Sequence, residues 1–136
     1  MKHEGITEKI IQAFYKVYNT FGYGFLEKVY ENAMYFELTG MGLKVDRQKK
    51  ILVYYLGNVV GDYCSDLTVE DVVISEIKSN EFLVEENEFQ LINYLKATNI
   101  EVGLLLNFGK RAEIKRKIYD NNRKSWQTTM ITRLEI

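Results

Sequence analysis

Proline is absent from this sequence of 136 residues, and cysteine and histidine occur once each. The single cysteine, Cys64, excludes a disulfide within the chain and any zinc or iron–sulfur site built from cysteines. The single histidine, His3, lies near a terminus that we expect to fray, so it gives little support to a histidine-activated nucleophile. No apolar run approaches the roughly 20 residues of a membrane-spanning helix. The first ten residues, MKHEGITEKI, lack the apolar region of a signal peptide.

These absences favour a cytoplasmic protein in a reducing compartment that does not bind a membrane. If the chain is an enzyme, its many carboxylates and lysines favour chemistry by those groups together with a hard metal ion. Hydrophobic residues make up 46% of the chain and charged residues 27%, which predicts a globular protein. The length fits one domain, and because no repeat or linker is visible we expect a single domain over residues 1–136.

The formal net charge is −1, so overall charge gives no sign of nucleic-acid binding. Basic residues are concentrated in segment 110–124, which has seven of them against two acidic residues. This segment predicts a local basic patch that includes Lys110, Arg111, Lys115 and Arg116. The alternative, which charge alone favours, is a solvated C-terminal helix and loop.

Hydrophobic periodicity predicts an α/β protein with a mixed sheet. The expected helices are residues 6–20, 25–38, 86–98 and 111–120, and the expected strands are 48–55, 59–69, 72–78, 102–108 and a last one within 126–136. In the second helix we expect Phe25, Val29, Ala33 and either Met34 or Phe36 on the buried side. The segment 102–108, VGLLLNF, is nearly all apolar, which is typical of a strand buried on both faces. Because this strand follows a helix, we expect it to pair parallel with an earlier strand.

Two charged residues lie on one face of the otherwise apolar strand 72–78. Strand side chains alternate between faces, so Glu76 and Lys78 point the same way, and burying either charge unpaired is costly. A buried ion pair is one explanation. A second explanation adds Asp66 from the preceding strand, because two carboxylates can hold Mg²⁺ while a lysine orients water or offsets developing charge on a phosphate.

The pairing of these two strands tests that second explanation. With a two-residue turn at Glu70-Asp71, Asp66 would face Ser75, and the carboxylates of Asp66 and Glu76 would point to opposite faces. They share a face only if the connection has three residues or a bulge, so that Asp66 lies opposite Glu76. We therefore predict this irregularity.

Several motifs resemble those of a known family. Asp66, nine residues, and then Glu76-x-Lys78 is similar to the signature of the PD-(D/E)xK nuclease superfamily. Gly24-Phe-Leu-Glu27-Lys-Val-Tyr30 resembles the motif that gives the GxxExxY protein family of that superfamily its name. Gln90-Leu-Ile-Asn-Tyr94 looks like the Q-x-x-x-Y motif of RecB-like nucleases, and segment 103–109, GLLLNFG, resembles a further strand of the family. The resemblance covers roughly residues 6–118, with the one departure that Tyr23 stands where the family often has proline.

The resemblance implies a restriction-endonuclease-like α-β-β-β-α-β core, in which helices flank a mixed central sheet. It also implies a catalytic set, with Asp66, Glu76 and Glu27 as metal ligands, Lys78 as the catalytic lysine, and Gln90 and Tyr94 lining the site. The expected activity is a nuclease that depends on Mg²⁺ or Mn²⁺ and hydrolyses phosphodiester bonds in DNA, with RNA as an alternative substrate. The basic residues at 110–117 would then neutralise phosphates, and a homodimer or larger complex is compatible with so small a chain.

Other interpretations of the same residues stay open at this stage. Taken alone, Glu27 is more often a solvated carboxylate, and the pair Gln90 and Tyr94 at helical spacing more often packs than reacts. The chain could be a nucleic-acid-binding or partner-interaction module that keeps the nuclease fold without cleaving, or a structural domain. A phosphate-binding loop at Gly103–Lys110 is excluded, because it has one residue too many between its glycines and Arg111 where the motif needs Ser or Thr.

Overall fold

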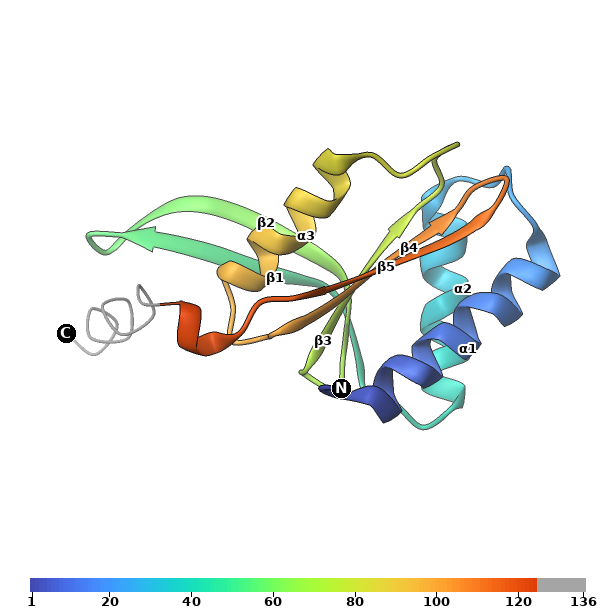
Figure 1. The fold of residues 1–136 in the computed structure, drawn as a ribbon, viewed down its shortest axis with the longest axis horizontal. Helices are drawn as coiled ribbons and strands as arrows, with labels where there is room; N and C mark the ends of the chain where they lie inside the picture. Colours follow the sequence, from blue (N-terminus) through green and yellow to red (C-terminus); the bar gives the residue numbers. More distant parts are fainter. Residues whose placement is uncertain (125–136) are drawn as a thin grey trace.

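The computed structural model describes residues 1–124, which form three helices and a five-stranded sheet (Figure 1). The elements in chain order are α1 (Glu4–Phe21), α2 (Glu27–Gly40), β1 (Val45–Tyr55), β2 (Asn58–Val69), β3 (Val73–Lys78), α3 (Glu85–Lys96), β4 (Val102–Phe108), β5 (Ala112–Ile118) and a 3-10 turn η1 (Asn121–Arg123). The first seven of these were predicted from the sequence, with bounds that differ by at most three residues. The expected strand within 126–136 lies outside the described residues.

The strands lie in the order β1-β2-β3-β4-β5, so each strand pairs with its neighbours in the sequence. The β3–β4 pair is parallel and the other pairs are antiparallel. The parallel pair is joined by α3, as a crossover connection requires. The predicted α/β fold with a mixed sheet flanked by helices is confirmed.

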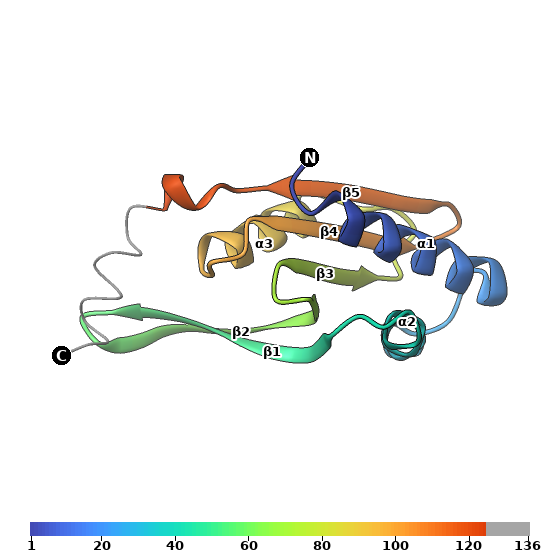
Figure 2. The same cartoon turned by 90° about the horizontal axis from the view of Figure 1, so that it is seen from below.

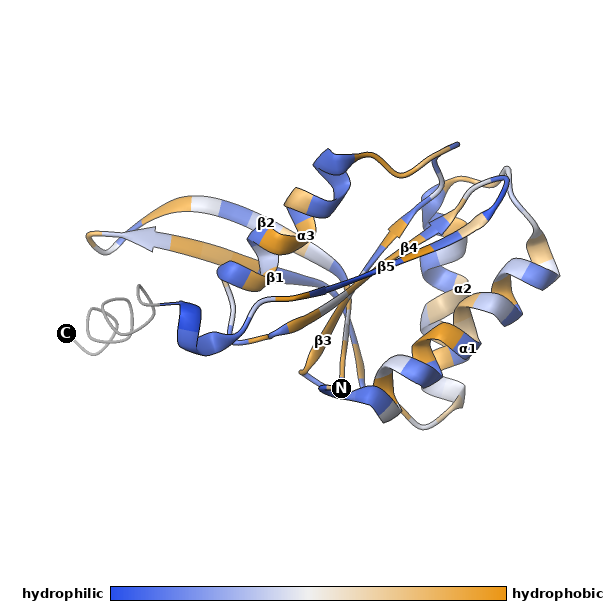
Figure 3. Cartoon of the chain, in the orientation of Figure 1, coloured by the Kyte–Doolittle hydropathy of each residue, from blue (hydrophilic) through white to orange (hydrophobic). Residues whose placement is uncertain are grey.

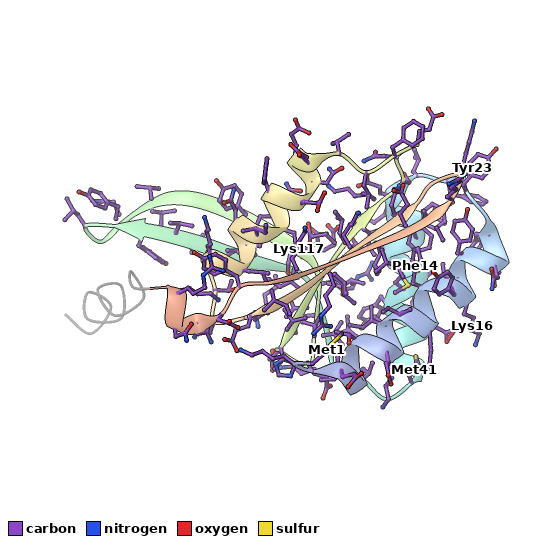
Figure 4. All side chains as sticks on the ribbon, in the orientation of Figure 1. Met1, Phe14, Lys16, Tyr23, Met41 and Lys117 are labelled. Carbon is purple, nitrogen blue, oxygen red and sulfur yellow. The ribbon has the colours of Figure 1, made fainter. Side chains whose placement is uncertain are left out.

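Helices cover both faces of the sheet, and two hydrophobic clusters fill the space between the layers (Figure 2). The helices α1 and α2 pack on one face, where Phe14 of α1 lies 4.7 Å from Phe108 of β4 between ring centroids (Figure 4). The helix α3 packs on the other face. Figure 3 shows that the hydrophobic residues of α1 lie on the side toward the sheet. None of the helices within residues 1–124 is long and apolar enough to cross a membrane.

The interior strand β4 is buried along its whole length. Its burial follows from its composition, because a run such as VGLLLNF has no polar face to turn toward water. Gly103 has a packing role in this strand, since a Cβ there would lie 2.7 Å from Cδ1 of Leu91. The helix α3 therefore packs directly against the backbone of β4.

The predicted helix at 111–120 is wrong, because these residues form the edge strand β5. Ala112 and Ile114 pack on the α1–α2 side, and Lys115 and Lys117 alternate with them. This is the period-2 pattern of a strand with one buried face. The backbone of β4 also needs hydrogen-bonding partners on the side away from β3, and β5 supplies them.

The predicted buried side of α2 is also wrong in part. Tyr30, Met34 and Leu38 are fully buried, whereas Phe36 is 69% exposed and Phe25 precedes the helix. Tyr30 determines which side of α2 faces the sheet, because its ring stacks on that of Phe108 with 4.2 Å between the centroids. Burial of Tyr30 with satisfied hydrogen bonds outweighs the gain from burying a second phenylalanine.

The strands β1 and β2 continue past the rest of the sheet as a two-stranded ribbon (Figures 1 and 2). They pair from Val45↔Val69 to Tyr55↔Asn58, whereas β2 pairs with β3 only over residues 67–69. The pairing of β2 with β3 therefore begins immediately after Asp66, and the two strands diverge on the N-terminal side of Leu67. This point of divergence is where the predicted site residues lie.

Candidate metal and catalytic site

The connection between β2 and β3 has the predicted irregularity. Val69 pairs with Val73, which leaves the three-residue loop 70–72 between the strands. The first two loop residues have φ of 52° and 58°, and the third donates its N–H to the carbonyl of Val69 at 3.1 Å. This is the pattern of a type I′ turn followed by one extra residue. The register consequently places Asp66 opposite Glu76, and the prediction of a three-residue loop is confirmed.

The carboxylates of Asp66 and Glu76 hold the two strands together where the backbone ladder ends. The last ladder pair is Leu67↔Ser75. Beyond it, the Asp66 N–H donates to Oε2 of Glu76 at 2.7 Å, and the Ile77 N–H donates to Oδ2 of Asp66 at 2.8 Å. Each carboxylate thus uses one oxygen to replace a ladder bond. The other oxygen of each group accepts no backbone N–H, and the one on Asp66, Oδ1, accepts only a long bond from Gln48 at 3.4 Å, so both have room for a ligand.

Both carboxylates have raised pKa values. Burial, together with the neighbouring charge of Asp66, raises the pKa of Glu76 to about 8, and only 3% of this residue is exposed. Burial raises the pKa of Asp66 as well, and the hydrogen bond from Ile77 opposes this effect. Lys78 is the cation that lowers both values. One lysine does not offset the cost of placing two carboxylates side by side in a buried position.

A divalent cation fits this pair of residues. Mg²⁺ and Mn²⁺ prefer oxygen ligands, and each carboxylate has one oxygen already fixed by a backbone N–H. Within residues 1–124, no three His, Cys, Asp or Glu groups are gathered closely enough to hold a metal by themselves. Two carboxylates are nevertheless sufficient for Mg²⁺, which keeps several waters when it binds to proteins. A bound cation would also supply the positive charge that the raised pKa values indicate is lacking.

Lys78, Gln90 and Tyr94 lie at the same site. Lys78 Nζ donates to Oε1 of Gln90 at 3.4 Å, which links β3 to α3. Tyr94 is 5% exposed, and burial followed by the charges of Glu76 and Asp66 raises its pKa to about 12. Its hydroxyl therefore stays protonated at neutral pH. Of the six residues predicted for the site, the structure brings these three together with Asp66 and Glu76.

The sixth predicted residue, Glu27, is not joined to the pair by any contact within the described part of the chain. It is the exposed first residue of α2. The acidic residue of α2 that faces the pair is Glu31, one helical turn further on, which is buried and acts electrostatically on both Asp66 and Glu76. Glu31 could have been considered from the sequence, because it lies four residues after Glu27 and residues four apart lie on one helix face.

Gln48 of β1 connects Glu31 to Asp66, and sequence reasoning missed it. Its Nε2 donates to Oε1 of Glu31 at 2.8 Å and to Oδ1 of Asp66 at 3.4 Å. Gln48 lies opposite Asp66 in the β1–β2 register, at a position where that ladder has no pair. Its φ is 49°, a left-handed conformation that is unfavourable for a residue other than glycine.

The regular alternation of side chains between the two faces of β2 is interrupted at Asp66. The hydroxyls of Ser65 and Thr68 are buried and lie 2.8 Å apart, although residues three apart in a regular strand point to opposite faces. The distortions at Gln48 and Asp66 therefore occur side by side in paired strands. Strain of this kind in a folded chain points to a functional constraint.

We expect Gln48→Gly to weaken metal binding without unfolding the protein. Glycine removes the backbone strain and the hydrogen bonds together, so the free energy of unfolding should change by less than about 1 kcal/mol. Metal affinity should fall roughly 10-fold or more, as for other residues that orient metal ligands. Mn²⁺ titration and thermal melts of the metal-free chain measure the two effects. Gln48→Leu, which keeps the strain, should be the less stable variant, and unchanged Mn²⁺ affinity in both would contradict this role.

The tyrosine of the Gly24–Tyr30 motif has a structural role. The Tyr30 hydroxyl donates to the carbonyl of Gly22 at 2.8 Å and accepts the N–H of Phe25 at 3.2 Å. Gly22 and Gly24 have φ of 64° and 112°, which explains the two glycines of this loop. Tyr30 thereby fixes the start of α2, the helix that carries Glu31. Tyr23 lies exposed in the same loop (Figure 4).

The structure does not gather the four predicted basic residues into one patch. Lys110 and Arg111 lie in the turn between β4 and β5, and Lys115 lies on the α3 side of β5. Arg116 lies on the opposite face of that strand, where its guanidinium donates to the Lys2 carbonyl at 2.7 Å. Lys117 pairs with Glu88 of α3 (Figure 4). The part of the predicted patch that remains open to a ligand is Lys110, Arg111 and Lys115.

Asn107 at the end of β4 holds the loop that follows Lys78. Its Oδ1 accepts the Asn80 N–H at 2.9 Å, and its Nδ2 donates to the Asn80 carbonyl at 3.0 Å. Gly109 allows this approach, because a Cβ there would lie 2.5 Å from the Asn80 oxygen. Asn107 therefore supports the end of β3. Among the described residues it makes no hydrogen bond to Asp66 or Glu76.

Comparison with known proteins agrees with this geometry. A family model described as the PD-(D/E)XK nuclease superfamily matches residues 4–117. No curated protein and no solved structure matches the chain significantly. The narrower resemblance to the GxxExxY family stays a prediction. The matched segment covers every element from α1 to β5 and all the residues of the site, and the chain belongs to the PD-(D/E)XK nuclease superfamily.

Proposed function

We propose that this protein is a nuclease that hydrolyses phosphodiester bonds in DNA and requires Mg²⁺ or Mn²⁺. The observation that carries the proposal is the interlocked pair of carboxylates, the half-buried Asp66 and the buried Glu76, with Lys78 two residues further along the same strand face. A purely structural pair of this kind would be costly, because each carboxylate has a raised pKa and little compensating charge.

The residues have distinct roles in the proposed reaction. When bound, a divalent cation supplies Lewis acidity toward the scissile phosphate and the attacking water. Asp66 and Glu76 hold that cation, and the backbone N–H bonds keep their carboxylates oriented. Lys78 positions the attacking water and offsets negative charge as it develops on the phosphate. Gln90 orients the Lys78 ammonium through the contact at 3.4 Å. Tyr94, protonated and largely buried, excludes bulk water from the pair.

Glu31 takes the part that the family resemblance assigns to Glu27. Its carboxylate contributes negative potential at the cation site, and through Gln48 it restrains Asp66. Lys28 and Arg47 lie 3.0 and 3.8 Å from Glu31 Oε2. These two cations pair with the carboxylate of Glu31, which also holds the Gln48 amide in place.

The substrate contacts outside the site are less specific. Lys110, Arg111 and Lys115 are available to neutralise phosphates, so binding should weaken as salt concentration rises. DNA is the proposed substrate, with RNA as the alternative that the assay below distinguishes. We also propose a cytoplasmic location and leave open a homodimer or larger complex, which would enlarge the contact with a duplex.

A strand-cleavage assay with matched glutamate variants tests this proposal. The wild type should cleave DNA in the presence of Mn²⁺ or Mg²⁺ and not in EDTA. Glu31→Gln should lower the rate about 10-fold or more, in line with residues that support metal ligands, and Glu27→Gln should change it by less than about threefold. If only Glu27→Gln lowers the cleavage rate, then Glu27 and not Glu31 supports the metal, as the family resemblance implies. Absence of cleavage on single-stranded, duplex and branched DNA and on RNA would contradict the nuclease proposal.

The second candidate is a nucleic-acid-binding or partner-interaction module that keeps this fold without cleaving. Among the described residues, the absence of a complete three-group metal cluster is the observation that favours it. It predicts binding that does not depend on divalent metal and that is unaffected by Lys78→Ala.

A further inference from the structure

Tyr63 on the β1–β2 ribbon is an aromatic side chain that neither the proposed reaction nor the hydrophobic core uses. It is 47% exposed, and it belongs to neither of the two core clusters. Its strand partner is Ile51, which packs in the cluster under α3, so Tyr63 projects from the face of the sheet that carries the site. Tyr63 is therefore a half-exposed aromatic ring on the same face of the sheet as the site.

The ring of Tyr63 is held in place on two sides. On one side the ring of Tyr94 lies 5.7 Å away between centroids, at an interplanar angle of 45°. On the other side the ring lies over Gly61, where a Cβ would be 3.0 Å from Cε2 of Tyr63 and 3.2 Å from Cβ of Val53. Glycine at this position in a strand allows the ring to lie down across the ribbon. Tyr63 is therefore a half-exposed ring with a restricted orientation.

This ring lies one side chain away from the paired carboxylates. Tyr94, the ring neighbour of Tyr63, interacts electrostatically with both Glu76 and Asp66. The adjacent pair on the same ribbon face, Lys49↔Ser65, supplies a lysine whose ion-pair distances to Asp71 and Asp46 are 3.4 and 3.9 Å. A restrained aromatic ring beside a phosphate-cleaving centre, with a loosely paired lysine next to it, matches the way proteins bind unpaired nucleotides.

We propose that Tyr63 is a base-stacking platform and that the substrate is single-stranded nucleic acid at the point of cleavage. A base of a duplex is stacked on both sides and cannot use the ring, whereas the base next to an unpaired phosphate can. The exposed part of Tyr63 stacks on that base, while Tyr94 and Gly61 fix the direction of the ring. This inference rests on the proposed nuclease function for the position of the scissile phosphate, and it specifies the substrate class.

The test measures binding without turnover. A single-stranded 15-mer of thymidines that contains one 2-aminopurine is titrated with wild type, Tyr63→Phe and Tyr63→Leu, with Ca²⁺ in place of Mg²⁺. A duplex of the same length is the control ligand. We expect Tyr63→Leu to weaken single-strand binding about tenfold and to remove the quenching of 2-aminopurine that stacking causes. Tyr63→Phe should stay within about twofold of wild type, because it keeps the ring, and duplex affinity should change less than twofold in either variant.

Other results would overturn the inference. These are undetectable single-strand binding by the wild type, equal single-strand binding by wild type and Tyr63→Leu, or an equal loss with the duplex. An equal loss in Tyr63→Phe would show that the hydroxyl matters and not the ring. Gly61→Ala, which displaces the ring without altering Tyr63, should reproduce the loss of quenching and serves where Tyr63→Leu fails to fold. If single-strand binding needs the Tyr63 ring but the protein does not cleave, only the nuclease proposal is contradicted. If the protein cleaves but binding does not depend on the ring, only this inference is contradicted.

Discussion

Replacing Lys78 by methionine is expected to lower the rate of DNA cleavage by at least about a hundredfold while leaving Mn²⁺ binding intact. The ammonium lies on the strand face of Glu76, and it is the cation that acts on both carboxylates. Its removal takes away charge stabilisation that is strongest in the transition state, so kcat should fall more than KM changes. Mn²⁺ affinity should stay the same or increase, because a competing positive charge next to the carboxylates is lost. Single-turnover cleavage and calorimetric titration measure the two effects separately.

The matched control for this variant is Lys9→Met on the exposed side of α1, far in sequence from the site. Its cleavage rate should stay within about twofold of wild type, as for most surface substitutions. If Lys78→Met cleaves as fast as Lys9→Met, then Lys78 has no catalytic role. If Lys78→Met loses Mn²⁺ binding as well, then the effect is on the site as a whole and the separation of roles proposed above is wrong.

The metal-free protein should lose stability as pH rises from about 4.5 to about 8. In the unfolded chain the Glu76 carboxyl has an ordinary pKa of 4.5, and in the folded chain burial raises its pKa to about 8. Between these values the unfolded state has released a proton that the folded state still binds, so the free energy of unfolding falls with pH. Below this range Glu76 is protonated in both states. Above it Glu76 is ionised in both states, and the full cost of burying its charge lowers the free energy of unfolding. We expect a decrease of about 2–4 kcal/mol, measured by urea denaturation at a series of pH values.

Two comparisons identify Glu76 as the source of this decrease. Glu76→Gln cannot ionise, so most of the decrease should disappear and the variant should exceed wild type in stability at pH 8. Glu8→Gln on the exposed side of α1 should keep the wild-type profile. Mn²⁺ should stabilise the wild type at pH 8 and have little effect on Glu76→Gln, because the ligand binds the folded state through this carboxylate. A wild-type profile that is flat between pH 4.5 and 8 would contradict the burial of an uncompensated carboxylate.

The part of the site that the sequence predicted is the part governed by strand alternation. Glu76 and Lys78 share a face in any strand, and Asp66 can join them only if the connecting loop has three residues or a bulge is present, so an irregular connection could be derived before the structure was known. The burial of β4 was predictable in the same way, because its seven residues are nearly all apolar. Local rules were sufficient in both cases.

The rest depended on contacts between distant segments. The strand β5 was mistaken for a helix because lysine, arginine, glutamate and alanine all favour helices, and its strand state comes from the need of β4 for a second neighbour. The placement of α2 is set by the stacking of Tyr30 on Phe108, and it brings Glu31, one turn further along the helix than Glu27, to the pair. Gln48 could not be found from sequence, since nothing local predicts a left-handed glutamine within a strand.

Titration of metal-free protein with Mn²⁺ by calorimetry, with Asp66→Asn beside the wild type, tests the central claim most directly. The claim is that the carboxylates of Asp66 and Glu76, one from each of two diverging strands, form a cation site. We predict that the wild type binds Mn²⁺ and that Asp66→Asn, which keeps a hydrogen-bond acceptor for Ile77 but loses the charge, binds it at least about tenfold more weakly. No heat of binding in the wild type, or equal binding by the folded variant, would contradict the account.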